Sequence, residues 1–175
     1  MASVYTARAA IIRKIPVSLH LLPTYVPMVE FFLWAVASGL LLGFCLAVGH
    51  PLTLAWLMLP LLCVSTLLLA YGLGLLLAAL SLFAPDLRPA SALSIQLVFW
   101  LTPIVYLADI LPPWLAGLMR YHPVYWTIAP AQHIVLHGRV GSLQPVLWQL
   151  MVAVLLIGVA AWVVRRLEKD IRDLL

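Results

Sequence analysis

Four long apolar runs, joined by short polar turns, constrain this chain more than any other feature of its sequence. They cover residues 25–48, 52–83, 90–107 and 145–164. About 20 apolar residues suffice to cross the hydrocarbon core of a bilayer, where a helix satisfies its own backbone hydrogen bonds. We therefore predict an all-α integral membrane protein with four transmembrane helices, forming a single domain over residues 1–175.

The composition supports the same fold class. The chain is 65% hydrophobic and only 9% charged, with a mean hydropathy of +1.11, whereas soluble domains contain about 25% charged residues. Its net charge of +4 comes from basic residues at the ends of apolar runs. This pattern is typical of contact with membrane lipid and does not favour a nucleic acid partner. Cys45 and Cys63 both lie inside apolar runs, so we expect small buried side chains rather than a disulfide framework.

The distribution of basic residues predicts how the helices are oriented. With four spans, both termini lie on one side, and that side holds eight of the ten Lys and Arg residues. The eight are Arg8, Arg13, Lys14, Arg88, Arg165, Arg166, Lys169 and Arg172. Only Arg120 and Arg139 fall on the other side. Because cytoplasmic loops carry the excess of Lys and Arg, we expect both termini to be cytoplasmic.

Residues 109–141 form an outer segment that is too aromatic for an ordinary loop. Its prolines are Pro112, Pro113, Pro123 and Pro130. Since each proline removes a backbone donor, we expect two short helices, at residues 114–120 and 130–137. Its aromatic residues include Trp114, Tyr121, Tyr125 and Trp126, which are types that settle where hydrocarbon meets water. We predict re-entrant or interfacial helices here, and we place the translocation path beside them because broken backbone at membrane depth needs protein or a wet cavity around it.

Polar and small residues inside the first two runs suggest helix contacts. Glu30 lies near the start of the first run, where a structural role is favoured over a proton relay. Gly39 and Gly43 form a GxxxG pair that would let another helix approach closely. Gly72 and Gly74 would give the second run a smooth packing face.

Near the N-terminus, residues 7–22 predict a short amphipathic helix on the cytoplasmic surface. Arg8, Arg13 and Lys14 alternate there with isoleucines, and Pro16 would end the helix. Two interpretations stay open: the segment is a positively charged anchor at the cytoplasmic membrane surface, or it is a docking site for a partner protein.

Seven short motifs, taken in order along the chain, resemble those of a known family. They read IIRKIPVSLHLLP, GLGLLLAAL, FAPDLRPA, WLTPIVY, LPPW, YHPVYW and HIVLHG. Each motif is degenerate, but their order and spacing resemble ABC-2 type transporter permeases, in the branch that exports O-antigen, capsule and teichoic acid polysaccharides. That family ordinarily has six spans, so this chain would correspond to its C-terminal four-span portion without the first two. Two positions depart from the family pattern: Pro85 stands where a basic residue is usual, and His133 lies at or beside a usual arginine.

The resemblance implies a transport subunit rather than an enzyme. It would export polysaccharide or lipid-linked glycan across the cytoplasmic (inner) membrane of a bacterium, as a homodimer with separate ATPase subunits. The chain contains no GxxxxGKS/T motif, so we expect it to bind no cofactor and its partner to bind ATP. The segment 7–22 would dock on that ATPase through Arg8, Arg13 and Lys14.

Aromatic residues are the candidates for lining the exit path, because their faces can stack on sugar rings and permit sliding. These candidates are Trp100, Tyr106, Tyr121, Tyr125 and Trp126. The alternative for each of them is an ordinary interfacial belt.

Two other functions remain open from the sequence. One keeps the ABC-2 architecture but exports a lipid or a drug. The other is a membrane-embedded metal-dependent enzyme that uses His133 and His137, whose i, i+4 spacing can hold a metal on one helix face. No glutamate lies between these histidines, and no Ser nucleophile motif is present, so we expect neither a catalytic nor a metal site.

Overall fold

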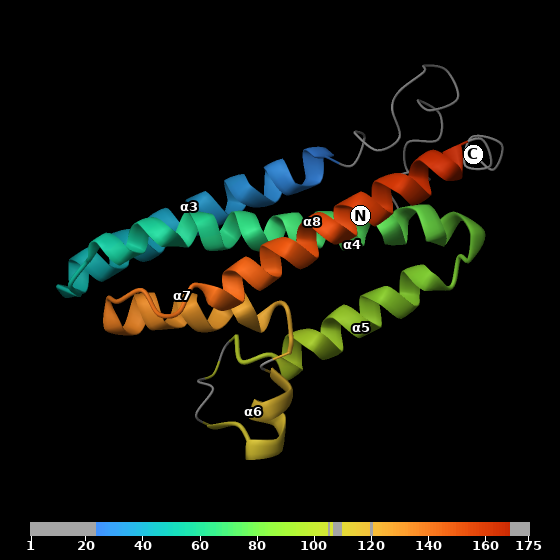
Figure 1. Ribbon diagram of the computed structural model, residues 1–175. Coiled ribbons are helices and arrows are strands. Elements are labelled where there is room, and N and C mark those ends of the chain that lie inside the picture. Colours follow the sequence, from blue (N-terminus) through green and yellow to red (C-terminus); the bar gives the residue numbers. More distant parts are fainter. Residues whose placement is uncertain (1–23, 105, 107–109, 120, 169–175) are drawn as a thin grey trace.

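The computed structural model describes residues 24–104, 106, 110–119 and 121–168, and every regular element within these ranges is a helix. In chain order they are α3 (Tyr25–Val48), η2 (Leu54–Met58), α4 (Leu59–Phe83), α5 (Leu87–Leu101), α6 (Pro113–Met119), α7 (Tyr125–His137) and α8 (Gln144–Arg166). Figure 1 shows α3, α4 and α8 as long rods lying roughly along one direction. The all-α membrane fold class is confirmed, whereas Arg8, Arg13, Lys14 and the start of the outer segment lie outside the described residues.

Three described stretches are long and apolar enough to cross a membrane: Tyr25–Val48, Leu54–Phe83 and Gln144–Arg166. They overlap three of the four apolar runs. The remaining run, residues 90–107, overlaps α5, which is 15 residues long and ends at Leu101, six residues before the expected end. The reason is local: Thr102 precedes Pro103 and adopts an extended backbone (φ −81°, ψ 131°), as steric clash with the proline ring favours. The count of four spans stays a prediction.

The centre of the bundle is the parallel pair α4 and α8. Ser65 contacts Gln149, and Gly72, seven residues further along, contacts Leu156, seven residues beyond Gln149. A contact register that repeats every seven residues is typical of helices wound gently around each other. A Cβ added to Gly72 would lie 3.0 Å from the backbone nitrogen of Ile157. The absence of a side chain at Gly72 is therefore what lets the two backbones approach.

Helix α3 packs much more loosely than α8. It lies antiparallel to α4, and Cys45 is its only buried residue. Next to its first residue it is joined to α4 by a hydrogen bond of 3.2 Å between the Thr24 and Tyr71 hydroxyls. Space is open around Gly39 and Gly43, where an added Cβ would meet nothing within 4 Å among the described residues. The GxxxG pair therefore contacts no described helix.

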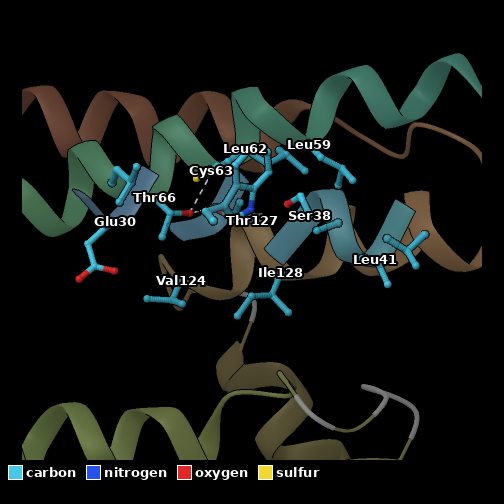
Figure 2. A pocket seen from close by; sticks show the side chains of 14 residues that line it. Glu30, Ser38, Leu41, Leu59, Leu62, Cys63, Thr66, Val124, Thr127 and Ile128 are labelled. Atoms are coloured by element: carbon cyan, nitrogen blue, oxygen red, sulfur yellow. Dashed lines mark hydrogen bonds between the residues drawn. The ribbon is translucent and has the colours of Figure 1, made fainter. Parts of the chain in front are cut away.

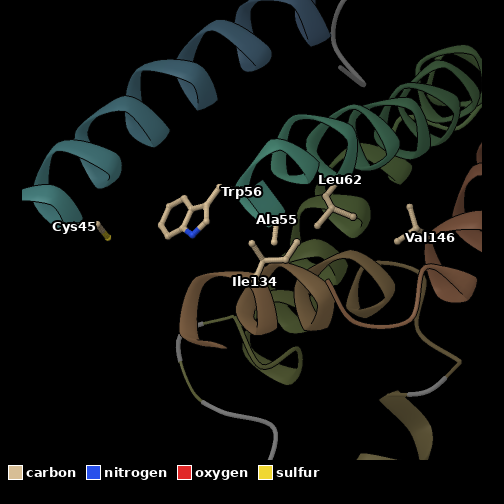
Figure 3. Packing of buried hydrophobic residues seen from close by; sticks show 6 residues of the cluster. All are labelled: Cys45, Ala55, Trp56, Leu62, Ile134 and Val146. Atoms are coloured by element: carbon tan, nitrogen blue, oxygen red, sulfur yellow. The ribbon is translucent and has the colours of Figure 1, made fainter. Parts of the chain in front are cut away.

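At the end of the bundle that carries the turn between α3 and η2, six buried residues join five helices. We call this the outer end, following the orientation predicted from the charges. The cluster contains Cys45, Ala55, Trp56, Leu62, Ile134 and Val146. Figure 3 shows Trp56 between Cys45 of α3 and Ile134 of α7. Through this cluster α7 becomes part of the bundle rather than a surface loop.

The predicted break at Pro130 is wrong, because α7 runs from Tyr125 through Pro130 to His137. Proline has no backbone donor and normally interrupts a helix. Here Thr127 and Ile134, on either side of Pro130, are both buried against other helices. These tertiary contacts hold α7 continuous across the proline. The other short helix, α6 (Pro113–Met119), lies within one residue of its predicted bounds.

Candidate functional site

An aromatic groove of about 560 Å³ lies between the first turns of α7 and α8. Its lining residues are Tyr121, Tyr125, Trp126, Ala129, Pro130, Gln144, Pro145 and Trp148. The structure thus brings three of the five predicted path residues, Tyr121, Tyr125 and Trp126, into one place. Tyr121 is 83% exposed and Trp148 is 50% exposed, so their rings are accessible from outside the bundle.

Sequence reasoning missed two members of this groove, Gln144 and Trp148. Both lie in the first two turns of α8. A tryptophan near the end of an apolar run is typical of the interfacial belt, so its type alone does not single it out. The available signal was the spacing, since residues four apart lie on the same face of a helix.

The other two path candidates lie apart from the groove, at the end of α5. Trp100 is 68% exposed, and its ring contacts Phe99 edge-on at 5.6 Å between centroids. The Tyr106 hydroxyl donates to the Leu101 carbonyl at 3.0 Å, which folds the chain after Pro103 back onto the helix end. This region is tied to α7, because Gln132 Nε2 donates to the Pro103 carbonyl at 2.8 Å.

Next to the first turn of α7, four polar side chains form a cluster that joins α7 to α4 and α8. We call Ser65, Thr66, Thr127 and Gln149 the polar cluster. Gln149 is fully buried, and its Oε1 accepts hydrogen bonds from Thr127 Oγ1 and, at 3.2 Å, from Ser65 Oγ. Gln149 Nε2 donates to Thr66 Oγ1 at 3.4 Å, and the Thr66 and Thr127 hydroxyls lie 3.0 Å apart. Because an unsatisfied polar group is costly in an apolar interior, these mutual bonds fix the first turn of α7 at this level.

The opposite end of α7 is fastened at the outer turn. His50 Nε2 donates to the Val135 carbonyl at 2.9 Å, and Thr53 Oγ1 donates to the Gly138 carbonyl at 2.7 Å. Gly138 ends the helix in the left-handed region (φ 65°), which glycine adopts without strain. Thr127 therefore lies level with Thr66 while Gly138 lies level with Thr53, so α7 runs antiparallel to η2 and the first half of α4.

A second cavity, of about 460 Å³, lies on the other side of α7, between it, α3 and α4. Two faces of α7 line the two hollows. This cavity is lined by Thr127, Ile128 and Ala131 of α7 and by Val124, the residue before the helix. The aromatic groove is lined by Tyr125, Trp126, Ala129 and Pro130. Figure 2 shows Glu30 at one end of this cavity and the Thr66 and Thr127 side chains on its wall. Helix α7 thus forms a partition between two hollows.

Three histidines lie on or next to α7: His122, His133 and His137. Burial lowers the pKa of His122, which precedes α7, and its Nδ1 has no hydrogen-bond partner within the described part of the chain. The rings of His133 and His137 lie 4.7 Å apart between centroids. Across the described residues, no three His, Cys, Asp or Glu side chains come together in a way that could hold a metal ion.

The fold and these hollows define a class of protein, a helical membrane protein with a hollow on each side of α7. No protein-family model matches the chain. It is similar to two curated relatives, both named O-antigen export system permease protein RfbA and both from Klebsiella pneumoniae. Each is 25% identical over 135 residues, which is 77% of this chain and 52% of the relative. The chain therefore spans about half the length of the relatives it matches.

This match confirms the resemblance to the polysaccharide-exporting branch of the ABC-2 permeases. Together with the three long apolar helices, it supports a multi-pass protein of the inner membrane. The relatives are transport proteins by name, which agrees with a transport subunit rather than an enzyme.

Proposed function

We propose that this chain is a membrane-spanning permease subunit of an ATP-driven exporter that moves polysaccharide or lipid-linked glycan out across the cytoplasmic membrane. The observation that carries the proposal is the likeness to O-antigen export permeases over 77% of the chain. The aromatic groove supports it, because aromatic rings can stack on sugars, the cargo class that the names of the relatives indicate.

In this proposal the aromatic groove guides the glycan past the first turns of α7 and α8. Flat rings of Tyr121, Tyr125, Trp126 and Trp148 offer apolar faces to sugar rings. Few groups there are able to fix a hydroxyl pattern, with the Gln144 amide and the two tyrosine hydroxyls as the main polar members. Stacking without a fixed hydrogen-bond pattern suits a polymer that must slide past the site.

Helix α7 then acts as a re-entrant element that separates the groove from the cavity behind it. From Thr127 to Gly138 it rises by 11 residue steps, or about 16 Å at ~1.5 Å per step. That is roughly half of a hydrocarbon core of about 30 Å. Its first turn would thus reach the middle of the membrane, where the polar cluster satisfies it.

The motor would be a separate ATPase subunit on the cytoplasmic side, and a second copy of the chain would complete the exporter. Arg8, Arg13 and Lys14 are the proposed docking residues, because a basic segment can pair with acidic groups on a partner. Both termini would be cytoplasmic, as the distribution of Lys and Arg favours.

The test uses cells in which this chain is expressed with the ATPase subunit proposed as its partner, and surface polysaccharide is measured. Trp126→Ala and Trp148→Ala together should lower surface polysaccharide several-fold at unchanged protein level, and the matching Phe variants should retain most of it. The control is Trp162→Ala, since Trp162 lies on the same helix α8, is 66% exposed and does not line the groove.

Two results would count against the proposal. Surface polysaccharide that persists after deletion of the chain would remove the exporter function. Normal polysaccharide in the double alanine variant would remove the role of the groove while leaving the exporter function in place.

A further inference from the structure

His133 and His137 form an exposed pair at the outer end of α7, and neither the groove nor the polar cluster uses them. They lie one turn apart, and their rings are tilted by 33° with centroids 4.7 Å apart. Both side chains are exposed, so solvent ions can reach them. The sequence led us to expect no metal site here; from the arrangement of the two rings we propose that this pair is a bidentate site for a divalent transition metal that prefers imidazole nitrogen, such as Ni²⁺, Cu²⁺ or Zn²⁺.

The ring of His133 is already held as a metal ligand would be. Its Nδ1 lies 3.0 Å from the Arg139 carbonyl oxygen. A carbonyl only accepts, so this contact places the proton on Nδ1 and leaves the lone pair of Nε2 free. Donation of the second ring nitrogen to a backbone carbonyl is the usual way in which proteins orient a ligating histidine.

The backbone after α7 supports the same ring from the side. A Cβ added to Gly141 would lie 3.9 Å from Nδ1 and Cγ of His133, so the 139–141 turn folds over the imidazole at ordinary contact distance. The turn itself starts at Gly138, which is anchored to Thr53. The His133 ring is thus positioned by structure that continues into the bundle.

The ring separation fits one metal ion between the two histidines. With a metal–nitrogen distance of about 2.1 Å, each ring centre would lie roughly 3.2 Å from the ion. Ring centres 4.7 Å apart then subtend an angle of about 95° at the metal, close to the range of roughly 90–109° found in octahedral and tetrahedral sites. The separation of the rings is thus compatible with one ion held by both histidines.

The donor set indicates which ions would bind. Imidazole suits Zn²⁺, Cu²⁺ and Ni²⁺, whereas Ca²⁺ and Mg²⁺ require oxygen ligands. Only two protein ligands are present among the described residues, so water would fill the other positions. Bridging residues four apart would stabilise the last turn of α7, the end that His50 and Thr53 also hold.

The test is titration of the purified full chain in detergent with NiCl₂ and with ZnCl₂, using an affinity tag that contains no histidine. Calorimetry should give one ion per chain, and the melting temperature should rise with metal concentration, because a ligand that binds the folded state stabilises it. MgCl₂ should produce neither effect.

Variants decide the assignment. His133→Ala and His137→Ala should each weaken binding at least tenfold and abolish the metal-dependent rise in melting temperature. His20→Ala is the control, as it removes a histidine outside the pair and should leave binding unchanged. Equal metal affinity in the pair variants and the parent chain would mean an adventitious ion only and would overturn the proposal. The absence of binding at millimolar metal would overturn it too. Neither result bears on glycan export.

Discussion

Helices α8 and α5 are both apolar, and both follow from apolar runs, yet they contact α4 in opposite ways. Helix α8 buries Val146, Gln149, Ala153, Ala160 and Val164 along its whole length. Helix α5 has no buried residue between Leu87 and Leu101. In Figure 1 it diverges from α4 after the short turn that joins the two helices. Apolar character is therefore a poor guide to which helices pack together.

The difference lies in the shape and polarity of the facing surfaces. Lipid tails are as apolar as leucine, so hydrophobic burial does not drive helices together within a membrane. Close packing of small residues and shared hydrogen bonds do so instead. The α4–α8 pair has both, in Gly72 and in the Ser65–Gln149 contact. Helix α5 presents Leu93, Ile95 and Leu97 outward and is tied to the rest mainly through its ends.

The largest effect is expected from Gly72→Leu, which would break the α4–α8 pair. The new side chain would collide with the Ile157 backbone, 3.0 Å from the Cβ position, and overpacking of this kind costs about 1–3 kcal/mol or more. We expect a clear drop in the melting temperature measured in detergent. The matched control is Gly43→Leu on α3, where nothing lies within 4 Å of the Cβ position. Equal destabilisation of both variants would contradict this account of the interface.

Next in size is Gln149→Leu, which keeps the volume of α8 but removes the polar cluster's central amide. The hydroxyls of Ser65, Thr66 and Thr127 would lose partners, at a cost of about 1–2 kcal/mol. Gln96→Leu makes the same substitution on exposed α5 and should be close to neutral. The unfolding midpoints of the two variants are compared in detergent. A larger loss of stability in Gln96→Leu than in Gln149→Leu would contradict the prediction.

The smallest effect is expected from Gln132→Ala, which tests whether α5 is held to the bundle mainly at its ends. Loss of the bond to the Pro103 carbonyl should lower global stability by only about 1 kcal/mol or less. Hydrogen exchange should nevertheless become faster in residues 95–104 and stay unchanged in residues 65–80. Acceleration in both segments would mean that α5 and α4 open as one unit.

Several local features were predictable from the sequence because they have local causes. The turn after the first run occurs at Gly49, whose positive φ of 75° closes α3. The bounds of α6 lie within one residue of those predicted from the prolines around it. Tyr121, Tyr125 and Trp126 stood out by their residue types in a proline-rich segment. These predictions required knowledge of neighbouring residues only.

The missed features depend on residues far apart in the chain. Gln144 and Trp148 join the groove only because α8 begins beside α7. Pro130 was expected to end a helix, and only the burial of Thr127 and Ile134 against other helices explains why α7 continues. The close packing predicted at Gly72 is confirmed, whereas Gly39 and Gly43, which were also expected to pack, contact no described helix.

The sequence by itself determined that this protein resides in a membrane, which stretches are mainly helical, and where most of these helices end. These properties follow from hydrocarbon thickness and backbone hydrogen bonding, which act on each segment separately. The tertiary structure alone decided that α8 packs on α4, that α7 enters the bundle and that aromatic rings meet in one groove. Those outcomes depend on side-chain shape and on polar pairs such as Ser65 and Gln149, and hydropathy contains no information about either.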